Sequence, residues 1–388
     1  MLMSLITVLP LFICFFWSFM LGYSLYYHGN IAAHKDLMIW AIAATVLYLG
    51  HCAFFNKEIG VLPFFDSAYV MCNLAVFPLY LVYLSRLTEG HVKFHVKVLA
   101  YGVPVAVGLA IGVLYFAMSP EETQEYIHVY LYHNAYQELT GASFAQAVVH
   151  QVAKVFFAVG VVFTLVQGVR KIRKYNRLVD SIYSDTEDKE LRSAETILKL
   201  LFLTSILAII ANAIGRYYFS GSFWLLLLAF IPFSVLLFAI GFTGYHQRFS
   251  YQDIVLVSDS VAEPVDEAEA HDEEANPVIH ELIAEIEKLM EGNLFLTPNL
   301  KVSDLAQELG TNSRYIQQAL NEGMGMSFAE FINRYRVDYA EALIKSNPSI
   351  CISDVYLQSG FSSQSAFYRN FRLYKNYSPK SIMLQDNK

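Results

Sequence analysis

A few polar and ionisable side chains interrupt the apolar stretch that fills the first two-thirds of this 388-residue sequence. Such groups are energetically costly inside a membrane, so each of them is a candidate functional residue. If the apolar segments cross a membrane, seven of these side chains should lie toward its outer side and line one pocket: His51, Asp66, Asn73, His150, Lys154, Asn212 and Arg216. The cations Lys154 and Arg216 would attract an anionic or polar ligand. The residues therefore predict a small-molecule site.

The same residues also have a structural interpretation. Asp66 can form an ion pair with Lys154 or Arg216, while the other polar groups lie near the membrane interface. His150 and Lys154 are four residues apart, which places them on one face of a helix in either interpretation. The sequence leaves both alternatives open.

Motifs of enzymes and metal sites are absent from the sequence. There is no HExxH, no GxSxG and no phosphate loop. The cysteines are scattered, without a CxxC pair, and are expected to be small buried apolar residues: Cys14, Cys52, Cys72 and Cys351. We therefore expect no catalytic residue, no metal and no cofactor.

The hydropathy pattern predicts helices that cross a membrane. Hydrophobic residues make up 55% of the chain and charged residues 16%, whereas about 25% charged is usual in soluble proteins. A spanning helix needs about 20 mostly apolar residues. Seven segments fit: Met3–Tyr27, Asp36–Phe55, Phe64–Leu87, Lys97–Met118, Ala147–Gly168, Thr196–Phe219 and Ser222–Tyr245. The first lacks the basic start and the cleavage site of a signal peptide. Residues 1–248 are thus expected to form a seven-transmembrane sensor domain.

The loops predict the orientation of this bundle, because Lys and Arg accumulate on the cytoplasmic side. The loop after the fifth span is strongly basic: Arg170, Lys171, Arg173, Lys174, Arg177, Lys189 and Arg192. The loop after the third span is also basic, whereas the loop after the fourth carries four glutamates and no Lys or Arg. With seven spans, we expect the N-terminus outside and the C-terminus in the cytoplasm.

Residues 249–277 are expected to form an acidic flexible linker. Lys and Arg are absent between Arg248 and Lys288, and nine acidic residues lie from Asp253 to Glu274. Large apolar side chains are scarce in most of this stretch, which is typical of a disordered tether. The stretch accounts for much of the net charge of −8.

The remaining residues, 278–388, have the pattern of a soluble helical domain. Expected helix starts and turns are marked by Ser303, Gly310, Asn312 and Ser313, Ser353, Gly360, and Ser362 or Ser363. Twice a helix ends at a glycine and a capped helix follows, with an amphipathic helix over Phe328–Lys345 between the two. A helix-turn-helix is built this way, and its second helix enters the major groove of DNA. The expected fold class is all-α: a seven-helix transmembrane bundle and a cytoplasmic domain with two helix-turn-helix modules.

This domain resembles the AraC/XylS family of transcription regulators over about Leu300–Met383. The first half of the resemblance is VSDLAQELGTNSRYIQQALNEGMGMSF (Val302–Phe328). The second half is ISDVYLQSGFSSQSAFYRNF (Ile352–Phe371), and it closes with Ser378-Pro379. Three positions depart from the family pattern. Tyr356 stands where a small residue is usual, Leu320 where Phe is usual, and Asn376 where Gly is usual.

The resemblance implies two recognition helices in successive major-groove turns of DNA. Base contacts would come from Arg314, Gln317, Gln318, Gln364, Ser365 and Arg369. Arg can bond guanine, Gln can bond adenine, and Ser suits either base. Phosphate contacts would come from Arg334, Arg336, Arg372, Lys375 and Lys380. Arg336 is also a candidate for a structural role, because it lies on the connecting helix. Core positions are expected at Ile316, Phe328, Val337, Phe361, Phe367 and Phe371.

The spans and the resemblance together predict a one-component transcription regulator in the bacterial inner membrane. Its expected partners are double-stranded DNA, the lipid bilayer and a small-molecule signal of periplasmic or membrane-borne origin. The positive balance from Leu300 onward is only +2, so DNA affinity should depend on a homodimer or on a tethered, high local concentration. Dimerisation of the bundle and docking of the domain are the expected signalling routes.

Two alternatives to this reading stay open. In one, the chain is a transporter-like protein or a receptor whose helix-turn-helix domain mediates protein interaction. In the other, proteolysis releases that domain.

Overall fold

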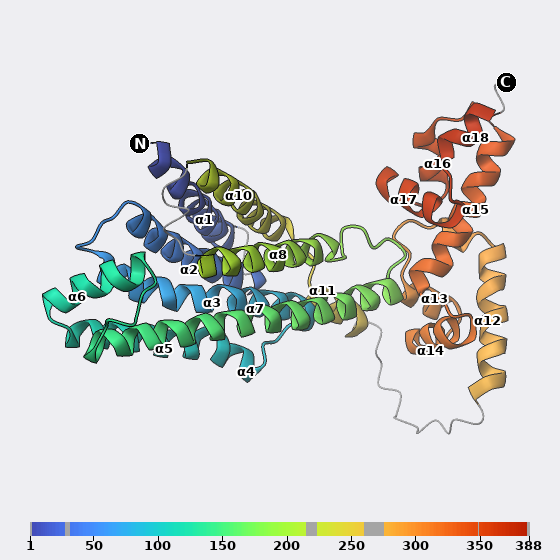
Figure 1. Cartoon of the computed structure of the whole chain (residues 1–388). Coiled ribbons are helices and arrows are strands. Elements are labelled where there is room, and N and C mark those ends of the chain that lie inside the picture. Colours follow the sequence, from blue (N-terminus) through green and yellow to red (C-terminus); the bar gives the residue numbers. More distant parts are fainter. Residues whose placement is uncertain (1, 28–31, 215–222, 260–274, 348, 386–388) are drawn as a thin grey trace. The chain divides into compact units, whose positions relative to one another are not determined.

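Two compact units make up the part of the chain that the structure describes. The computed structural model describes residues 2–27, 32–214, 223–259, 275–347 and 349–385. One unit contains Met1–Arg173 and Leu191–Tyr251, and the other contains Lys174–Glu190 and Gln252–Lys388. Most described residues are helical, and their only extended pairing is an isolated antiparallel bridge between Tyr183 and Lys301. The predicted all-α fold class is confirmed (Figure 1).

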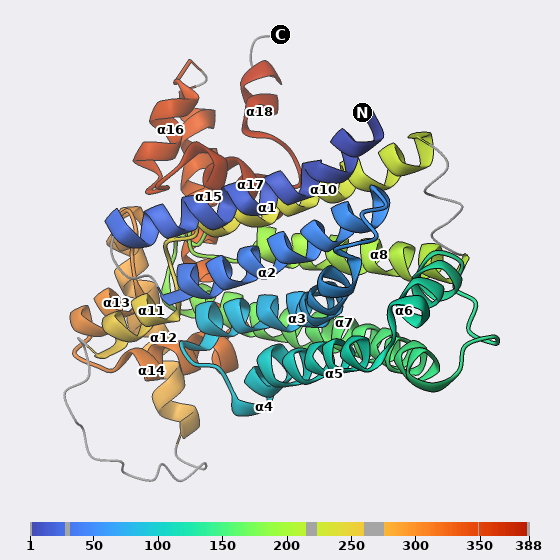
Figure 2. The ribbon, with the colours of Figure 1, turned by 90° about the vertical axis from the view of Figure 1, so that its left-hand side faces the viewer.

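The first unit is a bundle of long apolar helices joined by short ones. Its elements are α1 (Leu2–Tyr27), α2 (Ala32–Phe55), α3 (Leu62–Glu89), α4 (Phe94–Lys97), η1 (Val98–Gly102), α5 (Val103–Ala117), α6 (Pro120–Tyr126), η2 (Ile127–Tyr132), the larger part of α7 (Gly141–Ile182), α8 (Arg192–Ile214) and α10 (Phe223–His246). Within this unit α10, α1, α2, α3 and α5 pack side by side in that order (Figure 2).

Six helical stretches in the described residues are long and apolar enough to cross a membrane. They are Leu5–Tyr27, Ala32–Phe55, Leu62–Glu89, Phe94–Ala117, Gly141–Ile182 and Phe223–Val255. The predicted span Thr196–Phe219 begins as α8 but runs into residues outside the described ones. Seven spans therefore stay a prediction, as do the membrane location and the orientation.

The outer surface of the bundle is apolar. Phe12 and Phe19 of α1 each expose 65% of their surface, and Phe116 of α5 exposes 95%. By contrast, Leu81 and Leu84 of α3 are fully buried at 0%. Apolar faces of this extent are unfavourable in water and are normally covered by lipid or by a partner. The distribution supports the prediction that these helices lie in a membrane.

The second unit is a helical domain joined by the short segment 174–190. Its further elements are α11 (Tyr251–Asp259), α12 (Ala275–Glu291), η3 (Leu294–Leu296), α13 (Val302–Glu308), α14 (Ser313–Gln318), η4 (Ala319–Gly323), α15 (Phe328–Ser346), α16 (Ile352–Gln358), α17 (Gln364–Lys375) and α18 (Pro379–Gln385). The presence of segment 174–190 in this unit was not predicted from the sequence, which treats it as a loop between two spans.

Two of the four predicted helix caps in this domain are correct. The side chain of Asn312 accepts the backbone N–H of Arg314, and that of Ser363 accepts the N–H of Ala366. Ser303 and Ser353, however, lie inside their helices rather than before them. Because α13 begins at Val302 and α16 at Ile352, the N-cap positions fall on Lys301 and Cys351.

The core of the second helix-turn-helix module is aromatic. Phe361, Phe367 and Phe371 are buried at 0–1% exposure and pack on Val337 of α15. Ile316 and Phe328 are also buried, so all six predicted core positions are correct. Tyr356 packs against the same cluster and stays partly exposed, so the domain accommodates its bulk.

The predicted linker 249–277 is helical at both ends. Helix α11 occupies Tyr251–Asp259, and α12 already begins at Ala275. The central residues of the predicted linker, 260–274, lie outside the described part of the chain. The domain boundaries proposed from the sequence stay a prediction.

Candidate functional site

The candidate site is built from two helix-turn-helix modules joined by α15. The first module pairs α13 with α14 and the second pairs α16 with α17; the turns contain Gly310 and Gly360. Both glycines have positive φ, 61° and 78°, which lies in the left-handed region that glycine tolerates best. At Gly360 there is also no room for a side chain, since a Cβ would lie 2.7 Å from the carbonyl oxygen of Leu296.

The predicted base-contacting residues lie on α14 and α17. On α14, Arg314 is exposed and Gln318 Nε2 donates to Glu322 Oε2 at 2.9 Å. Gln317 Nε2 donates to the carbonyl oxygen of Ser181 at 3.2 Å. The structure therefore presents Arg314 and Gln318 at the surface of the domain, while Gln317 is engaged by segment 174–190.

On the second recognition helix, too, some of the predicted base-contacting residues are accessible and one is bonded to segment 174–190. Gln364 is exposed in the first turn of α17, and Arg369 is partly buried one turn further along. Ser365 donates its hydroxyl to Glu187 of segment 174–190. The chemistry suited to base contacts is present on α17, but one of its groups is already bonded to a carboxylate of the same chain.

The predicted phosphate-contacting residues differ in how free they are to reach DNA. Arg372 is exposed near the end of α17. Arg334 is paired with Glu330 at 2.6 Å and lies over the ring of Tyr374. Lys375 is held by two carboxylates, Asp338 at 2.7 Å and Glu341. Exposure and charge thus favour Arg372 over the other two.

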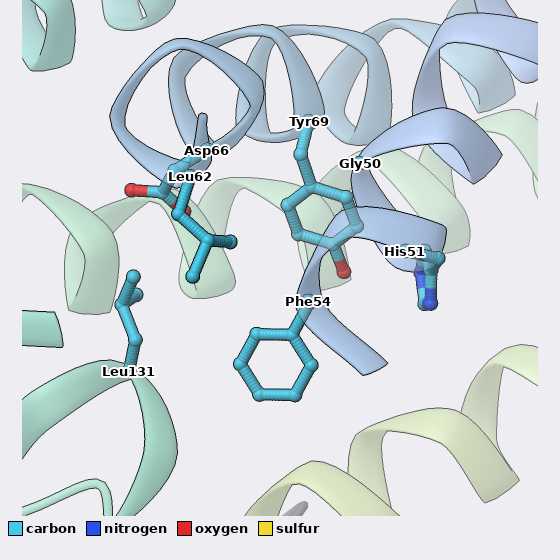
Figure 3. Close-up of a pocket in the computed structure, with 7 residues that line it drawn as sticks. All are labelled: Gly50, His51, Phe54, Leu62, Asp66, Tyr69 and Leu131. Atoms are coloured by element: carbon cyan, nitrogen blue, oxygen red, sulfur yellow. The ribbon is translucent and has the colours of Figure 1, made fainter. Parts of the chain in front are cut away.

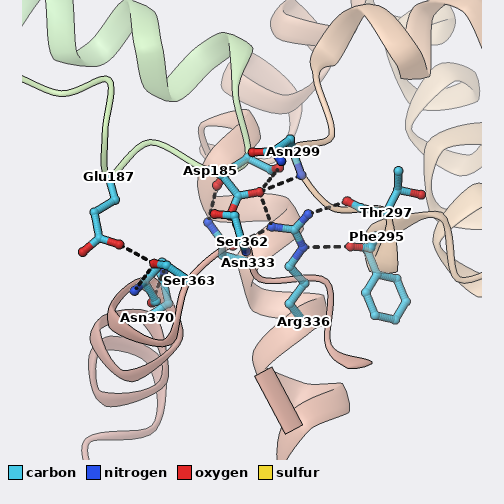
Figure 4. Close-up of polar contacts among 12 residues, drawn as sticks. Asp185, Glu187, Phe295, Thr297, Asn299, Asn333, Arg336, Ser362, Ser363 and Asn370 are labelled. Atoms are coloured by element: carbon cyan, nitrogen blue, oxygen red, sulfur yellow. Dashed lines mark hydrogen bonds and ion pairs between the residues drawn. The ribbon is translucent and has the colours of Figure 1, made fainter. Parts of the chain in front are cut away.

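Arg336 has the structural role that was one of its two interpretations. Its side chain is fully buried, at 0% exposure. The guanidinium donates to the carbonyl oxygens of Phe295 at 2.8 Å and Thr297 at 2.7 Å. A third bond, 3.1 Å long, goes from its Nη1 to Asp185 Oδ2 (Figure 4). A buried side chain with these partners cannot contact a DNA phosphate.

Asp185 connects segment 174–190 to several parts of the domain. Besides Arg336, its carboxylate accepts the backbone N–H of Asn299 at 3.0 Å and the hydroxyl of Ser362 at 2.9 Å. Burial alone would raise the pKa of Asp185, but the charge of Arg336 and the bonds from Ser362 outweigh it and hold the pKa below its ordinary value. Asp185 is therefore ionised when the segment is bound.

Two further contacts continue this attachment on either side of Asp185. The backbone N–H of Ser184 donates to Leu300 at 3.0 Å, and its carbonyl accepts Asn333 Nδ2 at 2.9 Å. Glu187 accepts a hydrogen bond from the hydroxyl of Ser363 at 2.6 Å (Figure 4). It also accepts one from the hydroxyl of Ser365. Sequence reasoning missed these residues; the one available signal was a group of acidic residues after the basic start of the loop: Asp180, Asp185, Glu187, Asp188 and Glu190.

A small pocket in the first unit contains two of the predicted ligand-binding residues. It is lined by Gly50, His51, Phe54, Leu62, Asp66, Tyr69 and Leu131 (Figure 3). His51 and Asp66 supply its ionisable groups, while the other lining residues are mostly apolar or aromatic. Such a lining suits a small ligand with one polar group.

Asp66 is paired, but with a partner that the sequence did not single out. Nε2 of His150 lies 3.0 Å from Asp66 Oδ2, and the hydroxyl of Tyr115 donates to the same oxygen at 2.9 Å. Both Asp66 and His150 are buried, at 7% exposure each. In the described residues Asp66 thus pairs with His150 and not with Lys154, while Arg216, the other partner expected from the sequence, lies outside them.

The other predicted ligand-binding residues do not join this pocket in the described structure. Lys154 is exposed, where it donates to Asn134 at 3.3 Å and lies over the ring of Tyr130. Asn73 is partly buried on α3 and is not among the lining residues. The side chain of Asn212 and the whole of Arg216 lie outside the described residues.

Comparison with known proteins bears on the second unit. Residues 305–384 match a family described as "Helix-turn-helix domain". The HTH-type transcriptional activator AarP of Providencia stuartii is 31% identical over 105 residues, which is 27% of this chain and 76% of that protein. The chain belongs to the helix-turn-helix transcriptional regulators. As a member of this group, it carries an AraC-type domain at its C-terminus.

Longer regulators share the domain alone. The HTH-type transcriptional regulators SAS0078 and SA0097 of Staphylococcus aureus are each 30% identical over 82 residues, 21% of this chain and 11% of theirs. The chain thus spans about a tenth of the length of these relatives. No solved structure matches the chain. The matched residues include both helix-turn-helix modules, so the relationship concerns DNA-binding regulation and not the apolar helices.

Proposed function

We propose that this regulator is a membrane-bound, one-component transcription factor that binds promoter DNA sequence-specifically and responds to a signal received by its apolar helices. The observation that carries the proposal is the joining, in one chain, of a two-module helix-turn-helix domain to six helices that are long and apolar enough to span a membrane. A separate sensor kinase would not be needed, because the sensing part and the DNA-binding part are covalently linked.

The residues exposed on α14 and α17 support sequence-specific binding. Arg314 and Gln364 are exposed on their recognition helices and Gln318 is partly exposed, and their side chains suit bidentate bonds to guanine or adenine. Arg372 adds a cation that can contact a phosphate, which positions the protein without selecting a sequence. The DNA-binding domain would lie in the cytoplasm of a bacterium, beneath the inner membrane.

The pocket lined by His51 and Asp66 is the proposed signal-binding site. Its ionisable groups lie among apolar and aromatic side chains, so a small molecule with a single polar or charged group fits its chemistry best. The buried pair of Asp66 and His150 would adjust to such a ligand, since a new hydrogen-bonding group at Asp66 competes with the imidazole.

Genome-wide DNA occupancy of the full-length protein tests the proposal. We expect discrete promoter sites for the wild type and their loss in the double variant Gln364→Ala, Arg369→Ala. A matched control is Lys288→Ala, Gln358→Ala, which removes one cation and one glutamine from exposed positions outside α14 and α17. The proposal fails if the Gln364→Ala, Arg369→Ala variant keeps the wild-type sites, or if no variant shows any site.

A further inference from the structure

Segment 174–190 meets both helix-turn-helix modules on groups that the regulator needs for DNA. In the first module, the carbonyl oxygen of Ser181 accepts the amide of Gln317 at 3.2 Å. In the second, Glu187 accepts the hydroxyls of Ser363 and Ser365. Gln317 and Ser365 are both predicted base-contacting residues. The segment therefore occupies part of each recognition helix.

Glu187 lies at the N-terminal end of α17, a position whose chemistry also suits a DNA phosphate. The first turn of α17 offers its N-terminal end, the hydroxyls of Ser363 and Ser365, and the charge of Arg369. These are the groups with which helix-turn-helix proteins hold phosphates. Burial alone would raise the pKa of Glu187, but the two serine bonds and the charge of Arg369 keep it below its ordinary value, so the group is an anion. A carboxylate at this position repels the DNA backbone and occupies the two serine hydroxyls that would otherwise donate to a phosphate.

We propose that segment 174–190 is an autoinhibitory element, which docks on the DNA-binding domain through Asp185 and blocks both recognition helices through Ser181 and Glu187. The inference rests on the proposed DNA-binding function. Docking and DNA binding are then mutually exclusive, and the fraction of free domain sets the promoter occupancy.

Segment 174–190 is bound to the DNA-binding domain through several hydrogen bonds, but it can dissociate. Asp185 neutralises the buried Arg336 and bonds to Asn299 and Ser362, so it anchors the segment. When the segment leaves, Arg336 keeps its bonds to the carbonyl oxygens of Phe295 and Thr297. The cation is thus never left without acceptors, which makes release feasible. An anchor with this chemistry suits a switch better than a permanent core contact.

The place of the segment in the chain makes it a direct route for a signal. It begins in the last turns of α7 and ends just before α8, the helices that contain the fifth and sixth predicted spans. A displacement at the end of either helix pulls on the segment itself.

DNA affinity of the full-length protein in nanodiscs tests this inference. The probe is a duplex from a promoter that the wild type or Glu187→Gln occupies in cells, compared with a scrambled duplex. Coupling energies between sites usually change affinity by about 5- to 150-fold, and we expect Glu187→Gln to tighten specific binding within this range. Asp188→Asn is the matched control, because it removes one negative charge from an exposed neighbour. Equal effects of the two variants, or none from Glu187→Gln, overturn the inference.

A disulfide provides a second, independent test. Tyr183 and Lys301 are partners in an antiparallel bridge, so their Cα atoms are within reach of a disulfide. We expect the variant Tyr183→Cys, Lys301→Cys, with Cys351→Ser, to lose DNA binding when oxidised and to regain it on reduction. Recovery on reduction excludes misfolding as the cause. Undiminished binding by the oxidised protein overturns the inference.

The outcomes also separate this inference from the proposed function. If binding depends on Gln364 and Arg369 but responds neither to Glu187→Gln nor to the disulfide, only the autoinhibitory role fails. If no variant binds DNA in either redox state, the proposed function and the autoinhibitory role both fail.

Discussion

Asp185 and Arg336 form a buried ion pair across 151 positions of the sequence, with Asp185 Oδ2 3.1 Å from Arg336 Nη1. Arg336 lies in the middle of α15, the helix that joins the two helix-turn-helix modules. Asp185 lies in a loop between two predicted spans. The pair therefore holds a segment that lies between the fifth and sixth predicted spans in the sequence against the framework of the DNA-binding domain, within one compact unit.

Removing the charge of Asp185 should loosen the segment. Loss of one partner from a buried pair typically destabilises by about 3–5 kcal/mol, and we expect the lower end for Asp185→Asn because Arg336 keeps two carbonyl acceptors. The amides of Asn299 and Ser362, which donate to Asp185, should exchange hydrogen about a hundredfold faster. Unchanged exchange at both amides would contradict this assignment, and Asp188→Asn serves as the control.

Acid should release the segment within a defined pH window. Asp185 and Glu187 both have folded pKa values below their ordinary ones, so their stabilisation is complete above the ordinary carboxyl range and is lost as pH falls through the lowered values. We expect docking to be independent of pH above about 5 and to weaken below about 4. Spin labels on Asp188→Cys and Arg372→Cys, with Cys351→Ser, would report the distance between the segment and α17 as the pH is lowered. A release centred near neutral pH would show that another group controls docking.

The two turn glycines should respond differently to alanine. Gly310→Ala places a side chain in open space, so only the left-handed backbone is unfavourable, by about 1–2 kcal/mol. Gly360→Ala adds a clash with Leu296, where the Cβ would lie 2.7 Å from a carbonyl oxygen. We therefore expect a greater loss of hydrogen-exchange protection in α17 for Gly360→Ala than in α14 for Gly310→Ala. Equal losses of protection would mean that the backbone near Leu296 moves to make room for the new Cβ at no cost in stability.

Thiol labelling should reveal the orientation in intact cells. The acidic loop after the fourth predicted span is expected outside, and segment 174–190 is expected inside. With Cys351→Ser, a membrane-impermeant maleimide should label Glu138→Cys directly and Asp188→Cys only after permeabilisation. Labelling of Asp188→Cys in intact cells would exclude the proposed orientation, and with it any access of the domain to chromosomal DNA.

Features that depend on neighbouring residues were correctly predicted from the sequence. Hydropathy runs mark the helices of the bundle, and Asn312 and Ser363 mark helix starts. The family resemblance places Phe361, Phe367 and Phe371 in the core, where they are buried. Asn376, which stands where Gly is usual in the family, has a left-handed backbone with φ of 62°. All of these are set by interactions within a few residues, such as side-chain periodicity and capping, so a linear reading is enough. Even so, Ser303 and Ser353 show that several candidate caps can compete locally.

Only the tertiary structure decided which charged and polar groups meet. His150 is 84 positions from Asp66 in the sequence, yet it is the partner that Asp66 takes in place of Lys154. In the sequence nothing distinguishes Asp185 and Glu187 from the other acidic residues of their loop, but in the fold they bind Arg336, Ser363 and Ser365. The physical reason is that hydrogen bonds and ion pairs act over a few ångströms in space, and the distance along the chain does not limit them. Residues that are so far apart in the sequence are brought together by the packing of whole helices. A local sequence pattern does not predict that packing.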